Sequence, residues 1–272
     1  MRNTLATAFN RLKSLIKGPF YSIYRRRLER KARRWRKPQH VGIIMDGNRR
    51  FARHAGYANV SQGHSKGAEQ LHEVLKWCWQ FDVKVITVWA FSLDNFSRDP
   101  DELAGLFDLF EAKFREIVDH PSIHKYHVKV RYIGHYQRLP ERLQRAIDAA
   151  EAATSHYDGI TLNVAIAYGG REEITDAFRR HIEAQVSAGL DATQIAAQLE
   201  PHHIDRYLYT AGLPDPDLII RTSGELRLSG FLLWQSVYSE YYFCDALWPA
   251  FRKIEFLRAL RAFDQRKRRF GK

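Results

Sequence analysis

Short continuous apolar runs alternate along the chain with longer stretches in which apolar residues recur every three or four positions. The short runs predict buried strands, and the longer stretches predict amphipathic helices. The predicted strands are 41–45, 83–91, 128–133, 160–167 and 218–221, with a further apolar run at 231–234. The predicted helices include 66–81, 100–118, 140–153, 172–188 and 254–269.

Repeated alternation of strand and helix indicates an α/β fold. We expect a single domain with a central, mainly parallel six-stranded sheet that is flanked by helices and covered on both faces. The ligands of such sheets gather beyond the carboxyl ends of the strands. Polar residues that directly follow a predicted strand are therefore the first candidates for a functional site.

The first such strand end is Asp-Gly-Asn-Arg-Arg at 46–50, where an apolar run stops abruptly. Gly47 lets the backbone approach a ligand closely, and the Arg side chains can donate forked hydrogen bonds to phosphate oxygens. Asp46 can hold a hard cation that bridges to a phosphate. The same residues also fit a strand that ends in a type I′ turn, whose Asp and Asn bond to their own backbone.

Two further strand ends carry similar side chains. Residues 92–98 read Ser-Leu-Asp-Asn-Phe-Ser-Arg, and residues 221–229 read Arg-Thr-Ser-Gly-Glu-Leu-Arg-Leu-Ser. Each offers arginine and hydroxyl groups where an anion would bind. The Gly turn at 168–171 also leads into a helix, but such turns more often only reverse the chain. The three polar strand ends together predict a site for an anionic, metal-associated ligand.

The predicted helix after Pro100 carries Leu103, Leu106, Phe107, Phe110 and Phe114 on one face. An apolar stripe of this kind usually packs into the core. It can also form the wall of a channel for a long hydrocarbon. The periodicity does not separate these two interpretations.

The net charge of +12 comes entirely from the N-terminal arm at residues 1–37. This arm contains 13 Lys or Arg and one acid, whereas the rest of the chain has 30 of each sign. A neutral body without a recognisable nucleic-acid module argues against binding to nucleic acid.

Within the arm, Leu5, Phe9, Leu12 and Ile16 recur at helical spacing among basic residues. This pattern predicts an amphipathic segment that lies on an anionic membrane surface. A solvated tail and, more weakly, a mitochondrial transit peptide are the alternatives.

The composition also indicates the cellular compartment of the protein. The two cysteines, Cys78 and Cys244, form no disulfide framework or zinc motif, which fits a reducing cytoplasm. No apolar run approaches the ~20 residues that span a bilayer. We therefore expect a cytoplasmic protein that associates peripherally with the inner face of a membrane.

The assembled motifs resemble the cis-prenyltransferase family of the undecaprenyl diphosphate synthase type. The resemblance rests on His-Val-Gly-Ile-Ile-Met-Asp-Gly-Asn-Arg-Arg-Phe-Ala-Arg at 40–53, on residues 92–98, and on 217–240 with Arg-Thr-Ser-Gly-Glu and Tyr-Ser-Glu. Several long motifs in the right order are far more specific than one short glycine pattern. The resemblance spans about 38–271 and implies a catalytic domain at 38–272.

The resemblance implies a parallel-sheet homodimer that condenses isopentenyl diphosphate with an allylic diphosphate, farnesyl or geranyl diphosphate, to give a medium- or long-chain Z-polyprenyl diphosphate. It implies Mg²⁺ on Asp46, with Glu240 reaching the partner subunit's site, and Asp46, Ser92 and Asn95 as catalytic residues. The implied substrate-binding residues are Gly47, Asn48, Arg49, Arg50, Phe51, His64, Phe96, Arg98, Arg221, Arg227 and Ser229. A hydrophobic tunnel enclosed by the fold would be lined by Ala90, Leu103, Leu106, Phe107 and Phe110.

The chain departs from the family pattern at several positions. Asp94 and Phe96 stand where Glu and Trp are usual, and residues 57–63 lack an Arg that bacterial members carry there. Ala90 is small, which leaves the implied tunnel open, but residues 228–230 resemble members with short products. A short-chain Z-prenyl diphosphate synthase and a non-catalytic scaffold subunit of a prenyltransferase complex are therefore the alternatives.

Overall fold

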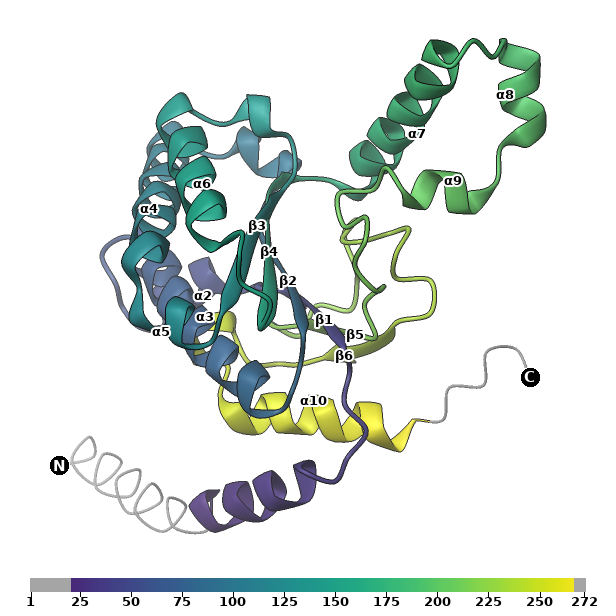
Figure 1. Ribbon diagram of the computed structural model, residues 1–272. Helices are drawn as coiled ribbons and strands as arrows, with labels where there is room; N and C mark the ends of the chain where they lie inside the picture. The colour runs from purple at the N-terminus through teal and green to yellow at the C-terminus, as the bar shows by residue number, and fades with distance from the viewer. Residues whose placement is uncertain (1–20, 267–272) are drawn as a thin grey trace, which may run out of the picture.

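A six-stranded parallel sheet forms the centre of the computed structural model, which describes residues 21–266 (Figure 1). The strands lie in the order β3-β4-β2-β1-β5-β6, and every neighbouring pair is parallel. Their bounds are β1 (His40–Ile44), β2 (Val85–Ser92), β3 (Val128–Ile133), β4 (Ile160–Tyr168), β5 (Leu218–Arg221) and β6 (Glu240–Phe243). The predicted six-stranded α/β sheet is confirmed.

The prediction of the sixth strand at 231–234 is wrong. These residues form turns, and the sixth strand is β6 at the sheet edge. Ser229, Gly230 and Leu232 have φ values of 54°, 97° and 47°, which no strand adopts. The apolar run is nevertheless buried, because Phe231 and Leu232 cover one face of the sheet next to Tyr168.

Helices cover the other face, on which the main core lies. Residues of α3, α4, α6 and α10 pack there against inward side chains of the strands, such as Val41, Ile43 and Val88. The helices are α2 (Asn48–His54), α3 (Ser61–Gln80), α4 (Pro100–Asp119), α5 (Pro121–Lys125), α6 (Glu141–Thr154), α7 (Gly170–Ser187), α8 (Ala192–Gln198), α9 (Pro201–Asp205) and α10 (Lys253–Gln265). Figure 1 shows α7, α8 and α9 extending away from the sheet.

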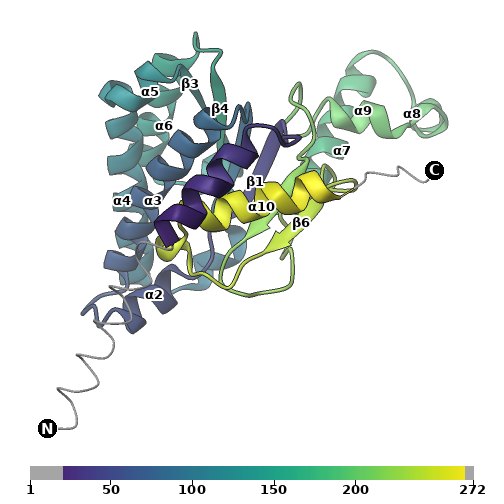
Figure 2. The same cartoon turned by 90° about the horizontal axis from the view of Figure 1, so that it is seen from below.

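Residues 21–32 form a further helix, which lies alongside α10 (Figure 2). Its Leu28 and Ala32 are buried in the main core, and Glu29 pairs with Lys253 of α10 at 3.2 Å. This part of the predicted arm therefore packs on the body. The apolar positions from Leu5 to Ile16 lie outside the described residues.

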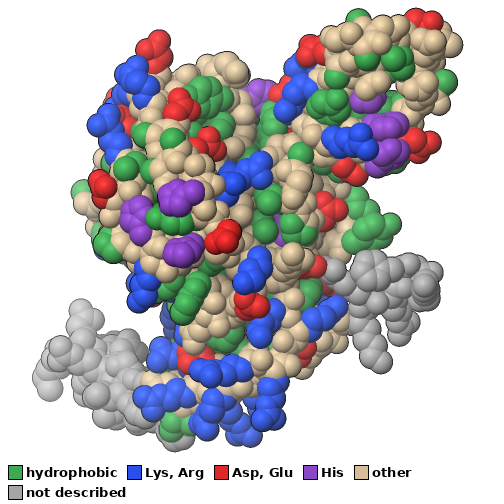
Figure 3. Space-filling view, viewed as in Figure 1, with side chains coloured by type: hydrophobic (Ala, Val, Ile, Leu, Met, Phe, Trp, Pro, Cys, Tyr) green, Lys and Arg blue, Asp and Glu red, His purple; other side chains and the backbone are tan. Residues whose placement is uncertain are grey.

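Lys and Arg side chains gather on the surface of this helix, at the bottom of Figure 3. Arg26, Arg30 and Arg33 are exposed there, on the side opposite the buried Leu28 and Ala32. Among residues 21–266, no helix is both long and apolar enough to cross a membrane.

Candidate active site

The carboxyl ends of β2, β1 and β5 lie side by side, because these three strands are neighbours in the sheet. This adjacency brings the three polar strand ends of the sequence to one edge, as predicted. They surround a cavity of about 640 Å³. Its lining includes Asp46, Gly47, Asn48, Arg49, Arg50, Arg53, His64, Ala90, Ser92, Asp94, Asn95, Arg98, Arg221 and Ser229.

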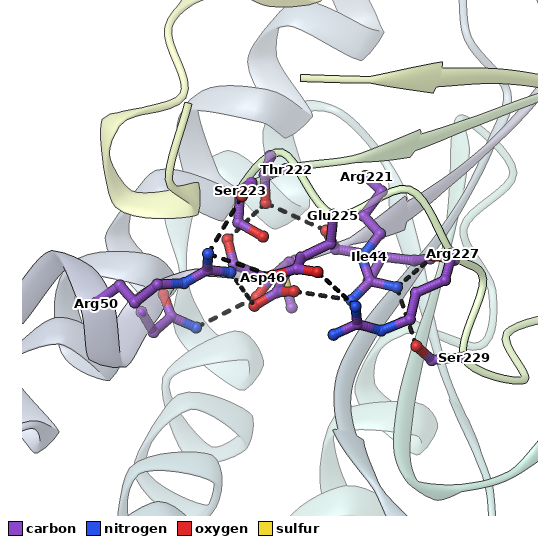
Figure 4. A network of polar contacts seen from close by, with 11 residues as sticks. Ile44, Asp46, Arg50, Arg221, Thr222, Ser223, Glu225, Arg227 and Ser229 are labelled. Carbon is purple, nitrogen blue, oxygen red and sulfur yellow. Dashed lines mark hydrogen bonds and ion pairs between the residues drawn. The ribbon is translucent and has the colours of Figure 1, made fainter. Parts of the chain in front are cut away.

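Asp46 lies at the centre of a polar network in this cavity (Figure 4). Its Oδ2 accepts a hydrogen bond of 2.9 Å from Nη2 of Arg221, and its Oδ1 lies 3.5 Å from Nη2 of Arg50. Its backbone carbonyl accepts hydrogen bonds from the Thr222 hydroxyl at 2.7 Å and the Trp248 amide at 3.0 Å. The carboxylate is therefore fixed between two guanidinium groups.

The pKa of Asp46 lies below its ordinary value. Partial burial acts to raise the pKa, but the hydrogen bond from Arg221, the nearby Ser223 hydroxyl and the positive charges of Arg221 and Arg50 outweigh it. Asp46 is consequently ionised at neutral pH. An ionised carboxylate is the form that binds a hard cation.

Gly47 makes the turn after β1 possible. Its φ of 107° is left-handed, and an added Cβ would lie 2.8 Å from Cδ2 and 3.1 Å from Cα of Leu247. The alternative of a type I′ turn does not apply, since α2 begins directly at Asn48. Gly63 and Gly67 of α3 allow close packing of α2, because a Cβ at either position would lie 2.3 Å from an oxygen of Asn48.

Glu102 of α4 organises the basic groups on the other side of the cavity. Its Oε1 lies 3.0 Å from Nη1 of Arg98, 3.6 Å from Nε of Arg49 and 3.5 Å from Nε2 of His64. Glu102 was not among the residues predicted from the sequence, although its position four residues after Arg98 is typical of an ion pair. One carboxylate thus holds two guanidinium groups next to the cavity.

Burial lowers the pKa of His64, and the charge of Arg98 adds to this effect, which the nearby Glu102 opposes. His64 is therefore neutral at pH 7. Burial also lowers the pKa of Arg98, which remains charged at that pH.

The segment after β5 supplies the third set of contacts. Arg221 is buried, and its Nη1 donates hydrogen bonds to the Ser229 hydroxyl at 3.0 Å and to the backbone carbonyl of Arg227. Glu225, which the sequence analysis also missed, accepts a hydrogen bond from Arg227 and lies 3.4 Å from Nη1 of Arg50. These contacts join the segment to α2.

Ser92 and Asn95 occupy the end of β2. The amide oxygen of Asn95 accepts a 3.2 Å hydrogen bond from the Ser92 backbone, which fixes the start of the 3-10 turn Leu93–Ser97. Both residues line the cavity. The Asn95 side chain is therefore held by its oxygen.

A smaller apolar cavity of about 110 Å³ adjoins the polar one and shares Met45, Asn48, His64 and Ala90 with it. Of the predicted tunnel residues, Ala90, Leu106 and Phe110 line this cavity. Leu103 packs against the main core, and Phe107 is buried against Phe91 and Phe96 with ring centroids 5.7 Å and 6.0 Å away.

Three other predicted site residues lie outside the lining of the polar cavity. Phe51 packs edge-to-face on Tyr57, and the ring of Phe96 packs on Phe91. Arg227 is exposed beside Glu225.

Glu240 starts β6 opposite Leu218, at the end of the sheet away from Asp46, and pairs with Arg266. The structure therefore does not bring Glu240 to Asp46 within one chain.

The charges of the lining determine which kind of ligand fits. Five arginines and two aspartates line the polar cavity, which leaves a positive excess. Arginine pairs well with phosphate oxygens, and the adjoining apolar cavity suits a hydrocarbon. The two cavities together fit a molecule with an anionic phosphate head and an apolar tail.

Comparison with known proteins agrees with this geometry. The family model described as "Putative undecaprenyl diphosphate synthase" matches residues 44–271. A Methanopyrus kandleri protein named tritrans,polycis-undecaprenyl-diphosphate synthase (geranylgeranyl-diphosphate specific) is 51% identical, covering 93% of this chain and 92% of its own length. A Thermobifida fusca protein named (2Z,6E)-farnesyl diphosphate synthase is 46% identical, covering 94% of this chain and 99% of its own.

A solved structure also resembles this chain. Lavandulyl diphosphate synthase from Lavandula x intermedia, in complex with dimethylallyl diphosphate, superposes with a TM-score of 0.78 at 35% identity. The match covers 87% of this chain and 99% of that one.

Proposed function

Because the chain belongs to the undecaprenyl diphosphate synthase family of prenyltransferases, we propose that its polar cavity condenses isopentenyl diphosphate with an allylic diphosphate to give a Z-polyprenyl diphosphate. The observation that carries the proposal is the ionised Asp46 between Arg50 and Arg221, next to an apolar cavity. A diphosphate head and a hydrocarbon tail are then bound in adjoining spaces.

Mg²⁺ fits the donor atoms at Asp46. This ion prefers oxygen ligands and usually binds through one or two carboxylates together with substrate phosphates. Asp46 offers an ionised carboxylate that lines the polar cavity. Arg50 and Arg221, which now pair with this carboxylate, can donate hydrogen bonds to the diphosphate when the ion is bound. When bound, Mg²⁺ neutralises negative charge on the diphosphates, and Asp46 is the residue that would hold it.

The groups around α2 bind the allylic diphosphate in this proposal. Breakage of its allylic C–O bond places negative charge on the departing diphosphate. Arg50, Arg49 and Arg98 are held in fixed positions by Asp46 and Glu102, so they need little reorganisation to stabilise that charge. The left-handed Gly47 and the following Asn48 let the backbone approach the same phosphate groups.

The segment after β5 binds isopentenyl diphosphate. Arg221 and Ser229 are already linked by a 3.0 Å hydrogen bond, and the exposed Arg227, whose guanidinium pairs with Glu225, follows Arg221 by six residues. After the allylic C–O bond has broken, the allylic carbon forms a new carbon–carbon bond with the isopentenyl double bond. The isopentenyl unit then loses a proton to the released diphosphate or to water. Ser92 and Asn95, which line the same cavity at the end of β2, assist the proton loss.

We further propose that the growing hydrocarbon chain enters the apolar cavity past Ala90. Burial of each CH₂ contributes about 0.8 kcal/mol, which favours elongation while apolar wall remains. The small side chain of Ala90 borders both cavities, so we propose a medium- or long-chain product, for which the apolar cavity of about 110 Å³ has to widen. The farnesyl diphosphate synthase relative keeps the short-chain alternative open.

We also propose a homodimer. Glu240 lies at the exposed edge strand β6, next to Val237 and Tyr238, which are 71% and 70% exposed. A partner subunit that packs on this edge would bring Glu240 to a second site, as the family resemblance implies. Retention of Asp46 together with Arg50, Arg98 and Arg221 argues against a non-catalytic scaffold.

The N-terminal helix supports a peripheral membrane attachment. Arg26, Arg30 and Arg33 are exposed on this helix, where they can contact anionic head groups. Cytoplasmic location is proposed with it, because the active site needs no membrane insertion in this account.

Incubation of the purified protein with Mg²⁺, labelled isopentenyl diphosphate and a series of allylic primers tests the proposed reaction. We expect label in longer prenyl diphosphates, and chromatographic sizing of these products gives their length. Absence of incorporation with geranyl, farnesyl and geranylgeranyl diphosphate would support the scaffold alternative.

A further inference from the structure

A group of three potential metal ligands lies beside the apolar cavity, away from Asp46. It consists of His72 from α3, Glu116 from α4 and His120 at the end of α4. Oε1 of Glu116 lies 3.8 Å from Nε2 of His72 and 3.7 Å from Nε2 of His120. One ligand atom of each residue lies within 4.8 Å of the other two, and the imidazole centroids are 4.6 Å apart.

We propose that this His72–Glu116–His120 cluster binds one divalent transition-metal ion of the zinc class. A point equidistant from three atoms at these separations lies roughly 2.2–2.4 Å from each, close to the ~2.0–2.2 Å of Zn–N and Zn–O bonds. Two imidazoles and one carboxylate are a donor set that zinc takes in proteins, with a fourth position left for water. Mg²⁺ prefers oxygen ligands, so this site differs in chemistry from the one at Asp46.

The surroundings of the cluster suit ligand binding at two of its three members. Lys113 pairs with Oε2 of Glu116, which orients the carboxylate and leaves Oε1 facing the imidazoles. Burial lowers the pKa of His72, and the neighbouring His120 adds to the effect. A neutral imidazole is the form that binds metal.

The third member must change one contact. Nδ1 of His120 accepts a 3.1 Å hydrogen bond from the Ser122 backbone at the start of α5. Metal on Nε2 requires the proton on Nδ1, so this hydrogen bond is lost when the ion binds. Faster hydrogen exchange of the Ser122 amide is therefore a specific signature of metal on His120.

The position of the site indicates what the ion would do. Glu116 follows Glu102 by fourteen residues on α4, which places it roughly 21 Å along the helix from the polar site. The ion would tie α3 to α4 at the side of the apolar cavity, whose wall both helices form. Metal binding itself does not depend on the proposed prenyl transfer. An effect of the ion on product length would rest on that proposed function.

Titration of untagged, metal-free protein with Zn²⁺ and Co²⁺, without any diphosphate, tests the proposal. We expect one ion per chain by calorimetry, and for Co²⁺ a visible absorption band typical of a four-coordinate site. His72→Ala and His120→Ala should each weaken binding at least tenfold. His203→Ala, which removes an imidazole stacked on His181 in a different part of the chain, should leave binding unchanged.

Asp46→Ala should also leave this binding unchanged, which separates the new site from the proposed magnesium site. Circular dichroism confirms that each variant is folded, and His72→Gln replaces His72→Ala if the latter does not fold. The proposal is overturned if the wild type shows no saturable binding of either ion. It is equally overturned if binding survives both His72→Ala and His120→Ala.

Discussion

Replacement of Gly47 by alanine is expected to damage both stability and activity, because this residue connects β1 to α2 immediately after Asp46. The new Cβ would lie 2.8 Å from Cδ2 and 3.1 Å from Cα of Leu247. The first of these contacts is with a side chain that can move. The second is with backbone, so the turn itself has to shift.

The expected loss of stability follows from two costs and one gain. The left-handed backbone costs an L-residue about 1–2 kcal/mol, and overpacking costs about 1–3 kcal/mol. Loss of glycine flexibility in the unfolded chain returns about 0.4–1 kcal/mol. The free energy of unfolding should therefore fall by about 2–4 kcal/mol, a large part of the usual ~5–15 kcal/mol.

Gly56 provides a matched control. Its φ of 70° is also left-handed, but an added Cβ would meet no atom within 4 Å. Gly56→Ala should therefore cost only the backbone part, about 1 kcal/mol after the unfolded-state gain. Urea unfolding of both variants measures the difference.

Activity should separate the two variants further. A shift of the turn displaces Asp46 and Asn48, and a misplacement of ~1 Å can lower catalysis about 100-fold. Gly56→Ala should keep nearly full turnover. If the two variants lose equal stability, the contact with Leu247 does not confine the turn and the reasoning is wrong.

Three further predictions concern other parts of the molecule. Burial lowers the pKa of His40 to about 4, so the unfolded chain binds more protons than the folded chain between about pH 6.5 and pH 4. The free energy of unfolding should therefore fall by about 3 kcal/mol as the pH drops through this window. Urea unfolding at several pH values should show a smaller change of this free energy with pH in His40→Gln. Ala90→Leu should narrow the entrance to the apolar cavity and shorten the products in a sizing assay; unchanged product lengths would show that the hydrocarbon takes another path. Joint replacement of Arg26, Arg30 and Arg33 by Gln should weaken binding to anionic vesicles by about 3 kcal/mol, while the buried Leu28 and Ala32 are kept. Neutral vesicles serve as the control. Equal binding of anionic vesicles by wild type and variant would refute the role of the arm.

The sequence was sufficient to predict five strands and the edge of the sheet that carries the site. Long apolar runs that end in polar residues are strong signals, and parallel strands place those ends together. The sixth strand was mistaken because Phe231 and Leu232 are as apolar as a strand but cover the sheet from outside. The true β6 is four partly exposed or exposed residues at the edge, Glu240–Phe243, which gives little apolar signal.

The sequence predicted the site residues at the strand ends, but it did not predict two of the carboxylates that pair with the arginines of the site. Glu102 and Glu225 were missed, because their roles depend on how α4 and the segment after β5 fold back toward α2. Phe107 shared the apolar stripe of Leu106 and Phe110 but points to Phe91 and Phe96 instead of the cavity. Periodicity identifies a buried face, but it does not show which residues of that face border a cavity.

In the proposed reaction, Asp46 and the arginines around it promote transfer of a prenyl group. The most direct measurement is the rate of label incorporation from isopentenyl diphosphate with Mg²⁺ and the preferred allylic primer, for wild type and for Asp46→Ala. The exposed Asp94, which lines the same cavity, supplies the control Asp94→Asn. We expect Asp46→Ala to lose at least ~100-fold in rate, whereas Asp94→Asn should keep most of it. Equal rates for Asp46→Ala and wild type would contradict the account.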